Sequence, residues 1–405
     1  MRVTAVPRAA AGVAAAGLLT CAVTFAGAPG AVAAAPCDTI PQPGPVSTAT
    51  PYEDRLYDLD RLAAIATGRD VRVAVVDSGV DDEHPQLAGR VAAGRDFLRG
   101  GANGRQDCAG HGTGVASVIV AGPVRGVVFH GLAPDATVVP VRISEQEEID
   151  GKAVGAQGGL GQFAQAIRWA SDPSGGGAQV INLSLVTGVD DRRVRAAVAQ
   201  ALDRGVVVVA AAGNNGGAGQ ANATPYPAAY PGVIGVGAVT ADGVRADYSQ
   251  RGDYVDLVAP GSGVTVAAVG SGHTVGDGTS FAAPFVSATA ALIVQRFPGS
   301  TPAQVRRRLV ATADPAPGGR RSDGYGFGVL NPYRAVTETL GPEQPAGPVP
   351  VSARSADPLV AARELRRERS RDAALVVAGA GVGLVLVAMA VTAVVRSGRR
   401  RRWRP

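Results

Sequence analysis

Short runs of apolar, β-branched residues alternate with helix-like segments through the middle of the chain. This alternation constrains the fold more than any other feature of the sequence. The apolar runs are expected to form buried strands at 71–77, 137–143, 179–184, 206–212, 233–239 and 255–258. Helices are expected near 111–121, 160–171, 191–203, 280–297 and 302–312. Such alternation predicts an α/β fold with a doubly wound, mostly parallel sheet. Sheets of this kind carry functional residues where strands end and helices begin.

Three glycine-framed corners of this pattern carry an acid, a histidine and a serine. Asp77 ends the first buried run in VAVVDSGV, His111 opens a helix in GHGTGVAS, and Ser280 opens another in GTSFAAP. A serine hydroxyl becomes a good nucleophile when an imidazole accepts its proton, and a carboxylate must hold that imidazole in the right tautomer. Asp, His and Ser in this chain order is a known arrangement for such chemistry. Taken alone, the Ser280 stretch is equally typical of an ordinary capped helix.

The three motifs together resemble those of the subtilisin-like serine proteases, over about residues 50–337. The resemblance implies Asp77, His111 and Ser280 as a catalytic triad, and Asn214 as the side chain of an oxyanion hole. It also implies that two strand ends bind substrate, through Ser184, Leu185, Val186, Ala211, Ala212 and Gly213. Val186 and Thr187 replace glycines that are usual in the family, so the resemblance gives no specificity. No calcium-loop pattern is present, and no metal or cofactor is expected.

The two ends of the chain indicate export and a membrane anchor. Residues 1–33 are expected to be a signal peptide with an Ala31-Val32-Ala33 cleavage site, the alternative being an uncleaved anchor helix. Residues 373–395 contain no charged residue over 23 positions, long enough for a transmembrane helix. The basic tail 396–405 is then expected in the cytoplasm, with the catalytic domain outside the plasma membrane.

The remaining segments are an N-terminal extension at 34–51, a peptidase domain at 52–340, and a Pro-rich and charged linker at 341–372. After cleavage Cys37 and Cys108 remain, and export favours one disulfide between them over two free thiols. A helix is expected over 52–66, with its apolar face formed by Leu56, Leu59, Leu62 and Ile65.

The charge distribution argues against nucleic acid as a partner. The net charge of +5 comes from the termini, because residues 359–405 carry 11 arginines against three acids. The remainder is mildly acidic, whereas nucleic-acid binding requires a basic face on the folded domain. His84 is expected to be structural, and His130 and His273 to lie in loops or at the surface. The charged loop at 144–161 is expected to be solvated.

The order of segments resembles one branch of the subtilisin-like family in particular. The order is similar to that of the mycosins, which are membrane-anchored serine proteases associated with type VII secretion systems. It consists of a signal peptide, a cysteine-bearing extension, a protease domain, a Pro-rich linker, a single span and a basic tail. The resemblance implies limited cleavage of secreted protein substrates and membership of a membrane secretion complex. A scaffold with little proteolysis is the alternative function, and a general degradative protease is a third.

Overall fold

The structure is a computed structural model that describes residues 37, 41–100, 103–149, 152–154 and 156–341. Apart from Gly341, these residues belong to the first of two compact units, Met1–Leu340 and Gly341–Pro405. The signal peptide expected at 1–33, the transmembrane helix expected at 373–395 and the basic tail at 396–405 lie outside the described residues. No helix within the described ranges is both long and apolar enough to span a bilayer.

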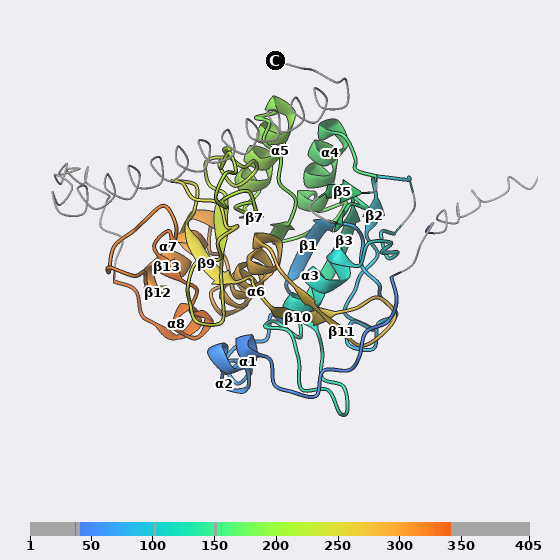
Figure 1. The fold of residues 1–405 in the computed structure, drawn as a ribbon, viewed down its shortest axis with the longest axis horizontal. Coiled ribbons are helices and arrows are strands. Elements are labelled where there is room, and N and C mark those ends of the chain that lie inside the picture. The colour runs from blue at the N-terminus through green and yellow to red at the C-terminus, as the bar shows by residue number, and fades with distance from the viewer. Residues whose placement is uncertain (1–36, 38–40, 101–102, 150–151, 155, 342–405) are drawn as a thin grey trace, which may run out of the picture. The chain divides into compact units, whose positions relative to one another are not determined.

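A nine-stranded sheet forms the centre of the first unit, in the order β12-β13-β9-β8-β7-β6-β1-β3-β2 (Figure 1). All neighbours from β13 to β2 pair in parallel, and only β12 is antiparallel. The strands are β1 (Arg72–Asp77), β2 (Arg95–Asp96), β3 (Thr137–Arg142), β6 (Val180–Leu183), β7 (Val207–Ala211), β8 (Ile234–Val239), β9 (Leu257–Pro260), β12 (Asp314–Pro315) and β13 (Gly328–Val329). β1 lies between β3 and β6, so later strands extend the sheet on both sides of it. The predicted mostly parallel α/β fold is confirmed.

Helices cover both faces of this sheet. They are α1 (Tyr52–Tyr57), α2 (Leu59–Ala63), α3 (His111–Val120), α4 (Leu160–Ser171), α5 (Arg192–Asp203), α6 (Thr279–Arg296), α7 (Pro302–Ala311) and α8 (Pro332–Thr337). One face carries α4 packed on α5, and the other carries α3 packed on α6. The five long helices agree with the sequence prediction to within one or two residues at each end.

Alternate residues of β1 face opposite layers, because successive side chains of a strand point to opposite faces. Val73 and Val75 pack in the core beneath α3 and α6, while Ala74 and Val76 pack beneath α4 and α5. Asp77 is two residues beyond Val75, so the pleat of the strand directs it toward the layer that contains α3 and α6.

The segment after the extension differs from its predicted helix. Asp58 has a left-handed backbone (φ 48°) and divides the segment into α1 and α2. Asp tolerates this conformation better than most residues. The break rotates the buried face, so Leu56 is 53% exposed, whereas the ring of Tyr57 is buried 5.7 Å from that of Phe285 in α6. Regular helical spacing therefore predicted the wrong face at Leu56.

His273 is buried in a hairpin, and its prediction as a surface or loop residue is wrong. The hairpin pairs β10 (Val264–Ala267) with β11 (His273–Gly276), and a second hairpin pairs β4 (Glu147–Ile149) with β5 (Lys152–Val154). The extension lies against β11, because the His273 amide donates to the Pro45 carbonyl at 2.9 Å and the Ser47 amide donates to His273 Nδ1 at 2.9 Å. Gln86 Oε1 lies 2.7 Å from the other ring nitrogen and the Phe129 ring lies 5.4 Å away, so the imidazole is enclosed by segments far apart in the sequence.

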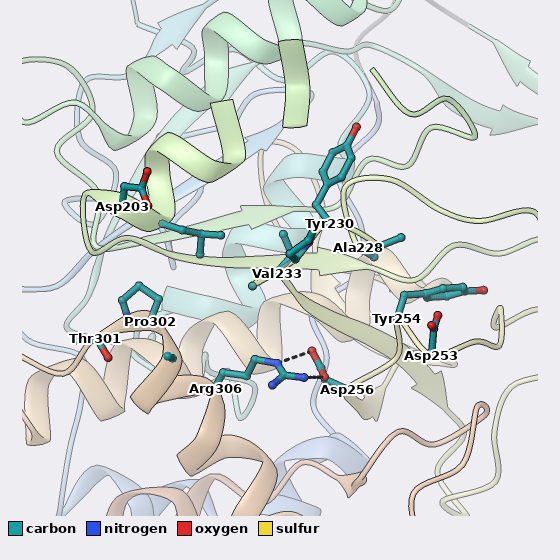
Figure 2. A pocket seen from close by; sticks show the side chains of 15 residues that line it. Asp203, Ala228, Tyr230, Val233, Asp253, Tyr254, Asp256, Thr301, Pro302 and Arg306 are labelled. Carbon is teal, nitrogen blue, oxygen red and sulfur yellow. Dashed lines mark hydrogen bonds and ion pairs between the residues drawn. The ribbon is translucent and has the colours of Figure 1, made fainter. Parts of the chain in front are cut away.

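A hollow of about 580 Å³ lies at the amino ends of β8 and β9, between the end of α5 and the start of α7. Figure 2 shows Arg306 of α7 turned toward Asp256, with which it forms an ion pair. None of Asp77, His111 and Ser280 lines this hollow. Functional residues of parallel sheets gather at the carboxyl ends of the strands, so this amino-end hollow is the less favoured site for chemistry.

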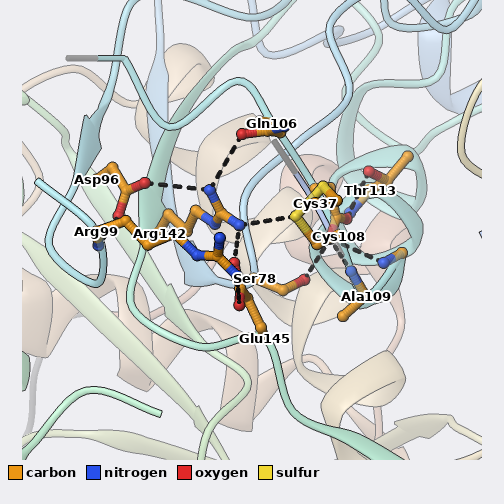
Figure 3. Close-up of a disulfide and its surroundings, with 12 residues drawn as sticks. Cys37, Ser78, Asp96, Arg99, Gln106, Cys108, Ala109, Thr113, Arg142 and Glu145 are labelled. Atoms are coloured by element: carbon orange, nitrogen blue, oxygen red, sulfur yellow. Dashed lines mark hydrogen bonds and ion pairs between the residues drawn. A yellow bond between two sulfur atoms is a disulfide. The ribbon is translucent and has the colours of Figure 1, made fainter. Parts of the chain in front are cut away.

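A disulfide joins Cys37 to Cys108, as the sequence predicted (Figure 3). It fastens the N-terminal extension to the loop that precedes α3. The linked residues are 71 positions apart, so the bridge removes a large closed loop from the unfolded ensemble.

Replacing both cysteines (Cys37→Ser with Cys108→Ser) is expected to lower the free energy of unfolding by about 4 kcal/mol, because the unfolded chain regains its loop entropy. Urea denaturation of both proteins measures the difference. Reductant should weaken the wild type and leave the variant unchanged. Equal sensitivity of the two proteins to reductant would contradict the prediction.

Candidate active site

The structure brings Asp77, His111 and Ser280 together from three separate elements. Asp77 ends β1, His111 is the first residue of α3, and Ser280 is the second residue of α6. His111 Nδ1 lies 2.7 Å from Asp77 Oδ1, and His111 Nε2 lies 3.0 Å from Ser280 Oγ. The three side chains therefore form one continuous hydrogen-bonded line from a buried carboxylate to a hydroxyl.

Opposing effects act on the protonation of His111. Burial by itself lowers the pKa of His111, but the charge and hydrogen bond of Asp77, with a contribution from the charge of Asp107, raise it above its ordinary 6.5. Asp77 is 1% exposed, and its Oδ1 also accepts the Ser78 amide at 2.7 Å. A buried carboxylate that faces the ring stabilises imidazolium, so the site suits an imidazole that gains a proton during a reaction.

Asn214 faces Ser280 across an open space. Its Oδ1 accepts hydrogen bonds from the amide and the hydroxyl of Thr279, both at 2.9 Å, which leaves its N–H₂ group available as a donor. A Cβ built on Gly278 would lie 2.9 Å from Ser280 Oγ and 3.1 Å from Asn214 Nδ2. Gly278 thus keeps this space empty, and its φ of +146° also favours glycine. The family resemblance implied Asn214, whereas the roles of Thr279 and Gly278 emerge only from the structure.

Pro284 leaves the backbone carbonyl of Ser280 without its helical donor, and Ser184 takes the place of that donor. Pro284 is the sixth residue of α6 and not in its first turn, so its missing N–H deprives the Ser280 carbonyl of the normal helical donor. The Ser184 hydroxyl supplies that hydrogen bond at 2.8 Å. Asn182 donates to Ser184 Oγ at 2.8 Å and accepts from Ser287 Oγ at 2.8 Å, so a buried relay ties α6 to the end of β6.

A cleft of about 490 Å³ surrounds the three side chains and contains most of the residues predicted to bind substrate. Ser184, Leu185, Val186, Ala211 and Gly213 all line it. Ala212 does not line it, because alternation along its strand turns it into a core cluster with Val239, Val255 and Val258. The other wall carries Ser144, Gln146 and Gln157. No short motif marks these residues, and only the fold places them beside the triad.

One end of the charged loop is buried, which corrects its prediction as a solvated loop. The Glu145 side chain is 8% exposed and forms ion pairs with Arg142 and with Arg99. Arg142 is itself fully buried on β3 and also pairs with Asp96 at 3.1 Å. Burial of a carboxylate is tolerated here because two guanidinium groups compensate its charge.

Ser184→Ala is expected to lower the free energy of unfolding by about 1–3 kcal/mol, because it leaves the Ser280 carbonyl buried without a donor. The loss should be smaller in a Pro284→Ala background, where residue 284 regains the N–H that helical geometry directs at that carbonyl. Urea denaturation of the four proteins in this cycle measures the coupling. If the two changes in the free energy of unfolding simply add, Ser184 does not replace the hydrogen bond that Pro284 removes.

The chain is similar in sequence to several known proteins. The model of the subtilase family (Peptidase S8) matches residues 68–328. Mycosin-4 of Mycobacterium tuberculosis is 35% identical over 386 residues, which cover 86% of this chain and 82% of that protein. Subtilisin E of Bacillus subtilis is 37% identical over 273 residues, covering 67% of this chain and 66% of that protein. The chain thus spans slightly less than two thirds of the subtilisin.

A solved structure shows the same relationship. It is described as that of a serine protease, MycP1, "an essential component of the type VII (ESX-1) secretion system". It matches with a TM-score of 0.63 and 31% identity, over 75% of this chain and 94% of that chain. The chain therefore belongs to the subtilase family and, within it, to the mycosin type.

Proposed function

We propose that the protein is a serine endopeptidase that uses Asp77, His111 and Ser280 to make limited cleavages in secreted proteins. The observation that carries this proposal is the hydrogen-bonded line from Asp77 through the imidazole to Ser280 Oγ, with distances of 2.7 and 3.0 Å. The line ends in a cleft whose lining combines small residues, such as Ser184, Ala211 and Gly213, with larger ones, such as Leu185 and Gln157.

In this mechanism His111 Nε2 takes the proton of Ser280 Oγ while the oxygen attacks the carbonyl carbon of the scissile peptide. Asp77 holds the Nδ1–H of the ring and stabilises the imidazolium that forms. The imidazolium then returns its proton to the leaving amine, and water hydrolyses the acyl-enzyme by the same route. Asp77 remains ionised throughout.

The developing oxyanion is stabilised in the space that Gly278 leaves open. Asn214 Nδ2 faces this space, and Thr279 has already fixed the orientation of its amide group. Donors held in place before the reaction need no reorganisation when charge develops, which is why such groups contribute strongly to catalysis.

A fluorophosphonate probe applied to the full chain in detergent is expected to label Ser280 in the wild type and nothing in Ser280→Ala, with mass spectrometry to locate the label. Gly278→Ala should label at least about 100-fold more slowly, because its methyl group would displace the attacking oxygen. Gly243→Ala is the matched control, because Gly243 also has a positive φ (71°) but meets nothing within 4 Å. Equal labelling of wild type and Gly278→Ala would contradict the proposed site.

The proposal includes a single-pass anchor at residues 373–395, with the peptidase outside the plasma membrane and the tail in the cytoplasm. The uncharged stretch and the arginines that follow it support this orientation. Type VII secretion enters the proposal through the relatives, because MycP1 is described as a component of such a system. Secreted substrates of that system, and its membrane complex, are the proposed partners.

Removal of residues 341–405 is expected to release the protein from the membrane fraction into the medium, with labelling of Ser280 retained. Immunoblots of the cell fractions and the medium measure where the protein is, and the fluorophosphonate probe measures the labelling of Ser280. A truncated protein that stays in the membrane fraction would contradict the proposed anchor.

Scaffolding of the secretion complex is the second candidate, favoured by the description of MycP1 as an essential component of its system. It predicts that secretion survives Ser280→Ala and fails when residues 341–405 are removed. The opposite pattern would leave proteolysis as the required function.

A further inference from the structure

Asp107 is a buried carboxylate, 3% exposed, that collects five hydrogen bonds just before α3. Its Oδ1 accepts from Ser78 Oγ at 2.8 Å, from the Ala109 amide at 3.1 Å and from the Gly110 amide at 2.8 Å. Its Oδ2 accepts from the Thr113 amide at 2.8 Å and from the Thr113 hydroxyl at 2.6 Å. A negative charge among the free N–H groups of a helix N-terminus is favourable.

These contacts link the two corners that carry the acid and the base of the triad. Ser78 directly follows Asp77, and Gly112 directly follows His111. Besides donating to Asp107, Ser78 Oγ accepts the Gly112 amide at 2.8 Å. One carboxylate and one hydroxyl therefore connect the end of β1 to the first turn of α3, immediately behind the bond between Asp77 and His111.

The loop that carries Asp107 is itself held from the other side. The next residue, Cys108, is fixed by the disulfide to Cys37. Arg142 Nη2 donates to Cys108 Sγ at 2.9 Å, and Arg142 lies opposite Asp77 in the register of β1 with β3 (Figure 3). The residue next to Asp107 is thus held by a covalent bond and a hydrogen bond, both outside the triad.

We propose that Asp107 is a positioning residue of the active site, which aligns the His111 ring with Asp77 and Ser280 and supplies a second negative charge that stabilises the protonated ring. This inference rests on the proposed serine protease mechanism. It assigns to Asp107 a role in the reaction that a simple helix cap would not have.

The charged groups around the ring are consistent with this role. Asp77 and Asp107 are the carboxylates whose charges raise the pKa of His111 against the effect of burial. Asp277 lines the same cleft, but its Oδ1 is engaged by Ser262 Oγ at 2.7 Å and by the Gly263 amide at 2.9 Å. On β3, the charge of Arg142 is compensated by its ion pairs with acids.

Burial raises the pKa of Asp107, while hydrogen bonds from Thr113, Ser78 and Gly110 favour its ionised form. Asp107→Asn removes the charge and keeps the shape of the side chain. Asp191→Asn is a matched control, since Asp191 caps α5 by accepting the Arg193 and Val194 amides in the same way, outside the triad. Ser78→Ala is a second test, because it breaks the link and leaves both carboxylates in place.

The experiment uses the full chain in detergent, with its four histidines carbon-13 labelled and the His111 signal assigned from a His111→Ala sample. The titration of His111 is followed by NMR, and the rate of fluorophosphonate labelling is measured over the pH range in which histidines titrate. Asp107→Asn is expected to lower the His111 midpoint, moving the acid limb of labelling to lower pH, and to slow labelling roughly tenfold on the alkaline plateau.

Ser78→Ala is expected to slow labelling with a midpoint that stays near the wild type, and Asp191→Asn to change neither property. An unchanged His111 midpoint in Asp107→Asn would overturn the inference, even if labelling slowed, because a purely structural cap would do the same. If Asp107→Asn does not fold, wild-type labelling rates in Ser78→Ala would overturn it. A wild type that is not labelled at all would instead count against the proposed function, and the NMR titration would still test Asp107.

Discussion

The hydrogen bond of 2.7 Å between Asp77 Oδ1 and His111 Nδ1 is the contact around which the rest of the site is arranged. It joins the end of a central strand to the start of a helix, two elements that are 34 residues apart. The pleat of β1 directs Asp77 toward the layer of α3 and α6, and α6 then brings Ser280 to the other ring nitrogen. Because both ring nitrogens are engaged, small movements of any of the three elements would break the line.

Two unusual local features accompany this alignment at Ser280. Pro284 removes a helical hydrogen bond from α6, and Ser184 replaces it with a side-chain donor. Gly278 adopts a backbone conformation that other residues avoid, and so leaves room beside Ser280 Oγ. A proline at this position would strongly destabilise an ordinary helix, and a residue other than glycine would be strained at position 278. The open space beside Ser280 thus depends on Gly278, and the hydrogen bond to the Ser280 carbonyl depends on the packing of α6 against the end of β6.

The fold and the candidate triad could be read from the sequence because their signals are local. Strand and helix periodicity extends over many residues, and Asp77, His111 and Ser280 each sit in a short motif. Predictions failed where distant segments decide the outcome. Asp58 turned the buried face of α1, the extension covered His273, and the pleat moved Ala212 out of the cleft. Glu145 is buried because Arg142 lies beneath it, a pairing that a count of charges in the loop does not reveal.

The sequence by itself determined the alternation of strands and helices, the candidates for acid, base and nucleophile, and the two cysteines available for a bridge. These properties depend on residue type and spacing along the chain. Only the tertiary structure decided which residues surround the candidate triad. Ser78 donates to Asp107 beside the first turn of α3, Thr279 holds Asn214, and Ser144, Gln146 and Gln157 line the far wall of the cleft. Such roles arise from contacts between elements far apart in sequence, and their hydrogen bonds exist only after the sheet has set the register of its strands.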